Sequence, residues 1–224
     1  EILNDFNLPK GSMQLVDQEF YMTIQKHTHH FEKKLASGGS AANTIHGLSR
    51  LGVATGFIGK VGVDEMGDFF RKDMIANKIE PFLIDSTTPS GVATALVSPD
   101  SERTFATFLG AACELAAENI NSDVFENYTH FHIEGYLVQN HDLIEAALKH
   151  AKQKGLIVSL DLASYNVVES NLEFLHRIVA EYVDIVFANE EEAKAFTGKE
   201  PEEALLELGK LAQIAVVKVG SKGS

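Results

Sequence analysis

The stretch Gly38-Gly39-Ser40-Ala41-Ala42-Asn43 decides how the rest of the chain is interpreted. Its two glycines precede a helix-prone segment, residues 41–51, which Gly52 ends. Because glycine has no Cβ, a Gly-Gly turn lets a bound group approach the backbone closely. The first N–H groups of the next helix lack intrahelical partners and favour an anion, whereas the Asn43 amide suits a polyhydroxylated ligand. The alternative interpretation is a tight turn that Ser40 caps.

A second glycine-rich stretch lies downstream of the first. Residues 55–61 are predicted to form a strand, and Gly62-Val63-Asp64-Glu65-Met66-Gly67 then opens another helix. The glycines at positions 38, 39, 52, 59, 62 and 67 form a series along the chain. Their spacing resembles the first signature of the ribokinase-like (PfkB) carbohydrate and nucleoside kinases. Ile45 departs from that pattern, since the family usually carries a small residue there.

The bulk composition narrows the class of protein. The chain has 224 residues, 45% of them hydrophobic and 23% charged, which is ordinary for a globular protein. Its net charge of −13 argues against nucleic acid and anionic membrane surfaces as partners. No apolar run reaches membrane-spanning length, and the single cysteine, Cys113, suits a reducing cytosol. We therefore expect a cytoplasmic protein without membrane or nucleic-acid partners.

Helical and strand patterns alternate along most of the chain, which predicts a parallel α/β sheet. The predicted helices cover residues 17–29, 41–51, 64–77, 141–154, 168–181, 189–197 and 201–212. The predicted strands cover residues 13–16, 55–61, 79–84, 128–133, 156–162, 183–188 and 214–219. The unbroken apolar run Leu156-Ile157-Val158 predicts a strand that is buried on both faces.

Residues 87–110 interrupt this alternation. The segments 91–97 and 103–109 are predicted strands, and Ser98-Pro99-Asp100-Ser101-Glu102 between them is a turn. Such a hairpin can cover a site as a lid. The alternative is a plain antiparallel extension of the main sheet.

Polar residues cluster where the predicted parallel strands end. In open α/β sheets the ligand crevice lies at the carboxyl ends of the strands. The residues placed there are Glu134, Tyr136, Asp161, Asn189, Glu192, Lys218, Gly220 and Gly223. Each has a structural alternative: Asp161 or Asn189 as a helix cap, Lys218 as a solvated strand end. Their shared position predicts a site.

The resemblance to the ribokinase-like family implies roles for these residues. Asn189-Glu190-Glu191-Glu192 is similar to the family's Asn-x-x-Glu motif, which implies that Asn189 and Glu192 arrange Mg²⁺ and phosphates, with Glu192 the metal-linked carboxylate. Lys218 to Gly223 resembles the ATP-binding loop, with Lys218, Gly220, Ser221 and Gly223 beside the nucleotide. Gly38, Gly39, Ser40 and Asn43 match the sugar-binding turn. The resemblance therefore implies that this turn binds sugar hydroxyls and serves as a hinge for the lid, and not that it binds an anion. Glu134 and Tyr136 resemble substrate-pocket residues, and Arg103 on the hairpin is a further substrate-binding candidate.

The resemblance also implies a fold and a domain plan. We expect an α/β, ribokinase-like three-layer sandwich with a central, mostly parallel sheet and a small β lid. The core would comprise residues 37–86 and 111–224, and the lid residues 11–16 and 87–110. Two family features are not found: a first strand with an acidic residue, and a Gly-Ala-Gly-Asp segment whose aspartate is the general base. We therefore expect part of a longer kinase, with its base beyond Ser224, and no turnover by these 224 residues alone.

Two classes of function follow. The first is an ATP- and Mg²⁺-dependent kinase that phosphorylates a primary hydroxyl of a sugar or nucleoside. The segments Leu8 to Met13 and Glu134-Gly135-Tyr136 look more like adenosine-kinase-type members than fructokinases. The second is a non-catalytic module that senses a sugar or nucleotide on the same fold. A homodimer through the lid is a further expectation.

Overall fold

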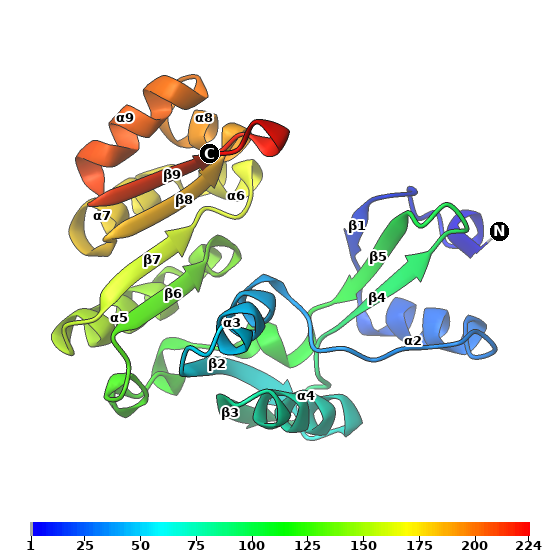
Figure 1. Ribbon diagram of the computed structural model, residues 1–224. Coiled ribbons are helices and arrows are strands. Elements are labelled where there is room, and N and C mark those ends of the chain that lie inside the picture. The colour runs from blue at the N-terminus through cyan, green and yellow to red at the C-terminus, as the bar shows by residue number, and fades with distance from the viewer. Residues whose placement is uncertain (1) are drawn as a thin grey trace. The chain divides into compact units, whose positions relative to one another are not determined.

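The computed structural model describes residues 2–224 (Figure 1). The described residues up to Leu115 form one compact unit, and Ala116–Ser224 form a second. The strands belong to three sheets, and every pairing among them is parallel except that of β4 (Val92–Val97) with β5 (Arg103–Phe108). Among the described residues there is no helix long and apolar enough to cross a membrane. The predicted α/β class with mostly parallel sheets is confirmed.

The hairpin in the first unit belongs to a sheet of its own. The strand order is β1-β5-β4, with β1 (Met13–Leu15) parallel to β5. The hairpin is therefore not an extension of the β2–β3 sheet, which corrects that alternative. Helix α2 (Gln18–His27) covers one face of this sheet, and α1 (Ile2–Asp5) precedes β1 in the chain. The Asp17 carboxylate begins α2 by accepting from the Phe20 N–H at 2.8 Å.

The two faces of the hairpin sheet differ in burial. Thr104, Ala106 and Phe108 are buried on the α2 side, where Ala106 packs with Ile24 and Leu8. Side chains alternate along a strand, so Arg103 and Phe105 lie on the opposite face. Residues in register with them are Met13, Ala95 and Val97, all of them exposed. This second face, called the open hairpin face below, is mostly apolar and carries Arg103 and Thr107 as polar side chains on β5.

The second sheet of the first unit is the parallel pair β2 (Thr55–Gly62) and β3 (Ile79–Ser86). Helices α3 (Ser40–Arg50) and α4 (Glu65–Ala76) pack with it. Ala42, Met74 and Ile79 form the buried centre, because the apolar stripes of both helices turn toward the sheet. Ile45 packs against this cluster, which gives the bulky residue at this position a structural role.

The second glycine-rich stretch forms a close-packed joint at the root of the hairpin. The Asp64 carboxylate accepts from the Gly67 N–H at 2.8 Å and from the Ser90 N–H at 2.7 Å. The Ser90 hydroxyl in turn accepts from the Gly62 N–H at 2.9 Å. Burial opposes ionisation of Asp64, but these hydrogen bonds hold the pKa of its carboxyl below the usual value. A Cβ at Gly67 would lie 2.2 Å from the Gly62 carbonyl oxygen, so both helix and strand depend on this glycine.

Short 3₁₀ turns that the sequence patterns did not predict follow the hairpin. They are η1 (Gly110–Glu114), η2 (Ala117–Asn119) and η3 (Ser122–Phe125). The Glu114 carboxylate accepts from the hydroxyls of Ser86, at 2.5 Å, and Thr88. These hydrogen bonds hold η1 against the end of β3 and lower the pKa of Glu114.

The second unit is a four-stranded parallel sheet. Its order is β6-β7-β8-β9, formed by β6 (His130–Glu134), β7 (Ile157–Asp161), β8 (Ile185–Asn189) and β9 (Ile214–Lys218). The connecting helices are α5 (His141–Gln153), α6 (Tyr165–Ser170), α7 (Leu172–Tyr182), α8 (Glu190–Thr197) and α9 (Pro201–Leu211). Two further 3₁₀ turns, η4 (Gly135–Gln139) and η5 (Gly220–Lys222), follow β6 and β9. Each strand therefore ends at the same edge of the sheet.

Two details of this unit differ from the sequence prediction. The helix expected over residues 168–181 is two helices, because the Asn171 amide donates to the Val167 carbonyl at 2.9 Å and ends α6. The strand β7 is not buried on both faces, which corrects that prediction. Val158 and Leu160 are fully buried, whereas Ile157 is 41% exposed, because the buried core of this unit lies on one face of the strand.

Candidate functional site

Four parallel strands bring polar side chains to one edge of the second unit. Glu134 on β6 is in register with Asp161 on β7, and Asn189 on β8 with Lys218 on β9. Side chains in register on neighbouring parallel strands share a face of the sheet. Glu192 joins them from the first turn of α8, which starts directly after Asn189. The structure thus places five of the polar residues predicted from strand ends along one edge of one sheet.

Asn189 and Glu192 form a reciprocal capping box. The Asn189 side-chain oxygen accepts from the Glu192 N–H at 2.9 Å, and the Glu192 carboxylate accepts from the Asn189 N–H at 2.8 Å and from its side-chain amide at 2.7 Å. The structural interpretation of Asn189 as a helix cap is therefore correct. Glu192 is only 3% exposed. Burial raises the pKa of the Glu192 carboxyl; the nearby Asp161 charge adds to this, while the Asn189 N–H and Lys218 oppose it.

This box leaves capacity for a metal ion's water. The hydrogen bonds from Asn189 use one lone pair on each Glu192 oxygen, so each oxygen can accept one more. Across residues 2–224, no group of three or more His, Cys, Asp or Glu side chains is arranged to hold a metal directly. A carboxylate with spare acceptor capacity can hold Mg²⁺ through the ion's own water molecules, a common arrangement for this ion beside phosphates.

Lys218 and Asp161 form an ion pair at the same edge. The Lys218 Nζ lies 2.7 Å from Asp161 Oδ2, and the Ala163 N–H donates to Asp161 Oδ1 at 2.9 Å. The Lys218 side chain is 47% exposed and that of Asp161 21% exposed. Lys218 is therefore a paired cation rather than the freely solvated strand end of the structural alternative.

Glu134 is buried at the end of β6, and Tyr136 follows it on η4 with 47% of its surface exposed. His132 lies two residues earlier on the same face of β6, with its Nε2 at 3.4 Å from Glu134 Oε1 and its Nδ1 at 2.8 Å from the Ser159 hydroxyl. His132 was not named among the residues predicted from the sequence. It could have been found from Glu134, because residues two apart on a strand share a face.

The loop after β9 is exposed and glycine-rich. Gly220 and Gly223 have positive φ values of 59° and 97°, and a Cβ built on either meets nothing within 4 Å. The Val219 N–H donates to the Gly223 carbonyl at 2.8 Å, which closes the turn around Ser221. The backbone here is open to solvent at both glycines, so a ligand can approach it closely.

The Gly-Gly turn lies in the first unit, at the start of α3. Gly39 adopts a φ of 98° and is the N-cap, and Ser40 is the first helical residue. No side chain caps this helix, so the alternative of a turn capped by Ser40 is wrong. Gly38, Gly39, Ser40 and Asn43 are all exposed. This helix start therefore presents open backbone and one amide side chain.

Arg103 begins β5, opposite Val97, on the open hairpin face. Its guanidinium is exposed, whereas Phe108 at the other end of the strand stacks on Tyr21 with ring centroids 5.6 Å apart. Of the two phenylalanines on β5, Phe108 packs against α2, and Phe105 lies on the open hairpin face.

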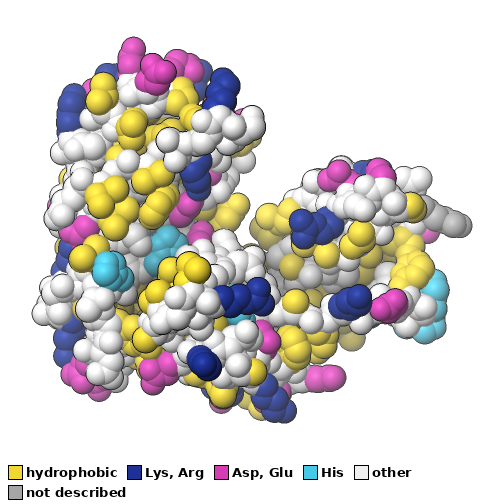
Figure 2. All heavy atoms as spheres, in the orientation of Figure 1, with side chains coloured by type: hydrophobic (Ala, Val, Ile, Leu, Met, Phe, Trp, Pro, Cys, Tyr) yellow, Lys and Arg dark blue, Asp and Glu magenta, His cyan; other side chains and the backbone are white. Residues whose placement is uncertain are grey.

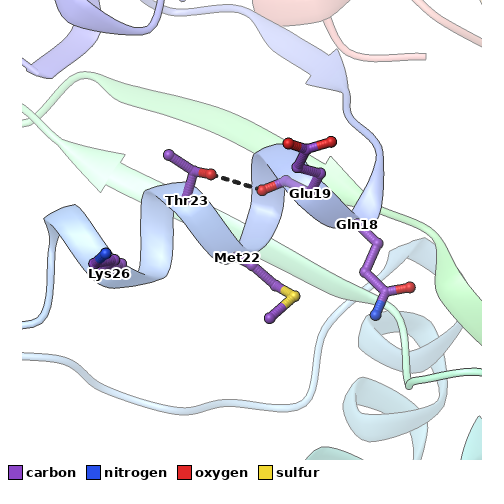
Figure 3. A pocket seen from close by; sticks show the side chains of 5 residues that line it. All are labelled: Gln18, Glu19, Met22, Thr23 and Lys26. Atoms are coloured by element: carbon purple, nitrogen blue, oxygen red, sulfur yellow. Dashed lines mark hydrogen bonds between the residues drawn. The ribbon is translucent and has the colours of Figure 1, made fainter.

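The hollow drawn in Figure 3 lies along α2 and contains no predicted site residue. Its lining residues are Gln18, Glu19, Met22, Thr23 and Lys26. All five come from one helix, and the Thr23 hydroxyl is already bonded to the Glu19 carbonyl at 2.8 Å. On the face shown in Figure 2, Lys and Arg side chains are dispersed among acidic ones. Neither feature offers a converging set of polar groups.

Known proteins resemble this chain over most of its length. The model of the pfkB family carbohydrate kinases matches residues 12–224. A 5-dehydro-2-deoxygluconokinase of Clostridium perfringens is 31% identical over 206 residues, which are 84% of this chain and 60% of that protein. Guanosine-inosine kinase of Escherichia coli is 28% identical over 217 residues, 89% of this chain and 49% of that protein. The chain thus spans about 60% or less of the length of these two relatives.

The solved structures include a similar fold. The adenosine kinase of Sinorhizobium meliloti superposes with a TM-score of 0.84 at 29% identity, covering 99% of this chain and 69% of that one. The expected ribokinase-like α/β fold is confirmed by this match.

Proposed function

Because the chain belongs to the pfkB family of carbohydrate kinases, we propose that the full-length protein transfers the γ-phosphate of ATP to a primary hydroxyl of a sugar or nucleoside. The observation that carries the proposal is the polar edge of the second unit, where the Asn189–Glu192 box lies beside the Lys218–Asp161 pair. Phosphoryl transfer depends mainly on positioning and on stabilising charge, and this edge supplies a cation and carboxylate acceptors.

The residues divide into two sets in this proposal. Lys218, Gly220, Ser221 and Gly223 bind the nucleotide, and Asn189 with Glu192 orients the water molecules of Mg²⁺. When bound, Mg²⁺ neutralises charge on the phosphate oxygens. Gly38, Gly39, Ser40 and Asn43 bind the hydroxyl-bearing substrate, with Arg103, Glu134 and Tyr136 as further contacts. The family resemblance implies that an aspartate serves as the general base of such a transfer.

The domain plan remains part of the proposal. Residues 11–16 and 87–110 act as a lid, and residues 37–86 and 111–224 as the kinase core. The three-stranded sheet supports a lid because strands β1, β4 and β5 fold together and apart from β2–β3. Dimerisation through this lid and a cytoplasmic location complete the proposal.

We further propose an adenosine-like nucleoside as the preferred substrate. The relatives act by name on sugar acids and on nucleosides, so the family alone leaves the substrate open. Phe105 lies on the open hairpin face of the first unit, and Tyr136 in the second unit is half exposed; each is an aromatic surface on which a nucleobase can stack. A free sugar uses such surface less fully.

A competition assay tests the proposal. The full-length protein is given ATP and Mg²⁺ with adenosine, ribose, fructose and 5-dehydro-2-deoxygluconate at equal concentration, and each phosphorylated product is quantified. We expect the highest kcat/KM for adenosine. A higher value for another acceptor would refute the nucleoside preference, and no ATP-dependent product from any acceptor would refute the kinase activity.

A further inference from the structure

The Lys218–Asp161 pair crosses an intervening strand. Lys218 on β9 is in register with Asn189 of β8, and Asp161 on β7 is in register with Phe187 of β8. Neighbouring strands lie about 4.8 Å apart, so β7 and β9 are separated by about 10 Å. With Nζ 2.7 Å from Asp161 Oδ2, the Lys218 side chain must span the carboxyl end of β8. It therefore lies across the strand end from which the Asn189–Glu192 box begins.

Asp161 is the fixed member of the pair. Its Oδ1 accepts from the Ala163 N–H at 2.9 Å, and Ala163 holds a φ of 64°, which is uncommon for a residue with a Cβ. A Cβ at Gly135 would lie 2.6 Å from the Asp161 carbonyl oxygen, so the backbone of Asp161 is packed against η4. The carboxylate is thus held by its own turn, while the four-carbon lysine side chain is intrinsically flexible.

The ammonium group retains capacity for a second partner. It has three donors, and Asp161 Oδ2 uses one of them. The Lys218 side chain is about half exposed at the strand ends, directly before the open loop Gly220–Gly223. An anion that reaches this edge can therefore bind the ammonium without displacing Asp161.

We propose that Asp161 is a positioning residue that holds the Lys218 ammonium across the end of β8, where it receives a phosphate oxygen of the nucleotide. This inference rests on the proposed kinase function. Without the Asp161 carboxylate, Lys218 samples many rotamers and meets the phosphate in the correct place less often. Asp161 then acts on phosphoryl transfer only through Lys218.

A double-mutant cycle in the full-length protein tests this dependence. Lys218→Met keeps the side-chain length and removes the charge, and Asp161→Asn keeps the shape and removes the charge. We expect each single variant to lower kcat/KM for ATP by about tenfold or more, and Asp161→Asn to have less than about a twofold effect in the Lys218→Met background. Asp161→Glu should restore part of the loss. Lys194→Met is the matched control, because Lys194 pairs with Glu200 at 2.7 Å in the same unit and should leave the kinetics unchanged.

Calorimetric titration with ATP in the absence of metal supplies a readout besides activity. The same non-additive pattern is expected in Kd. Equal losses from Asp161→Asn in both backgrounds would show that Asp161 acts through its own turn, and would overturn the inference. Unmodified protein that neither binds nor uses ATP would instead overturn the proposed function on which the inference rests.

Discussion

Gly67→Ala should destabilise the first unit, although alanine is ordinarily the better helix residue. In a helix interior, replacing glycine by alanine gains about 1 kcal/mol. At Gly67, however, the new Cβ would lie 2.2 Å from the Gly62 carbonyl oxygen and 3.0 Å from the Ser90 hydroxyl. The close neighbour is backbone, which cannot rotate away, so the overpacking cost falls at the upper end of its range, about 3 kcal/mol. The net loss in unfolding free energy is therefore about 2 kcal/mol.

Gly47→Ala is the matched control in the same unit. Gly47 lies within α3, and a Cβ built there meets nothing within 4 Å. Only the propensity gain remains, so this variant should be more stable by about 1 kcal/mol. The two substitutions are chemically identical, and they should differ by about 3 kcal/mol because of their surroundings alone.

The assay must report the stability of the first unit, which contains both substitutions. Hydrogen exchange of the α4 amides reports the opening free energy of that unit, because the chain comprises two compact units. Thermal midpoints supply a second measurement, with about 2–4 °C expected per kcal/mol for a chain of this size. If Gly67→Ala proved as stabilising as Gly47→Ala, the close-packed joint at the hairpin root would be refuted.

Four further predictions follow from the site and the fold. Asn43→Ala should weaken acceptor binding far more than ATP binding, by about 1–3 kcal/mol, because it removes a hydrogen-bonding side chain. Glu192→Gln should lower turnover and raise the Mg²⁺ concentration needed for half-maximal rate, because the amide loses the charge that attracts the metal. Hydrogen exchange over residues 88–109 should slow when acceptor binds, as expected of a closing lid. Asp184→Asn should destabilise the protein at neutral pH and lose this effect in acid. Burial acts to raise the pKa of the Asp184 carboxyl, but the net shift is downward because Lys152 donates a hydrogen bond to it. The ionised carboxylate therefore stabilises the fold above about pH 4, and this stabilisation is lost as pH falls through the folded-state pKa.

Each of these predictions has an outcome that would contradict it. Equal losses for acceptor and ATP in Asn43→Ala would remove Asn43 from the acceptor site. An unchanged Mg²⁺ requirement in Glu192→Gln would leave the carboxylate as a helix cap only. Unaltered exchange at saturating acceptor would count against a lid. A stability difference between Asp184→Asn and the unmodified protein that stays constant from pH 7 to pH 2 would show that ionisation of Asp184 is irrelevant to folding.

Much of the fold could be predicted because its signals are local. The alternation of helix and strand, the caps at Asp17 and Asn189, and the glycine spacing each arise from residues close together in the chain. The gathering of Glu134, Asp161, Asn189 and Lys218 at one edge followed too, because parallel strands joined by helices must bring their carboxyl ends to one edge. No alternative topology separates Asn189 from Glu192, since only two residues lie between them.

The sequence alone therefore determined the α/β class, the alternation of most helices and strands, and which polar residues end strands, because periodicity and turn chemistry act over a few residues. Only the tertiary structure decided that β1 joins the hairpin in a separate sheet, that Phe108 is buried while Phe105 is open, and that Lys218 reaches over β8 to Asp161. The partners Lys218 and Asp161 are 57 positions apart in the chain. Such contacts depend on strand register and on the direction of each side chain, which packing between distant segments sets and no local pattern encodes.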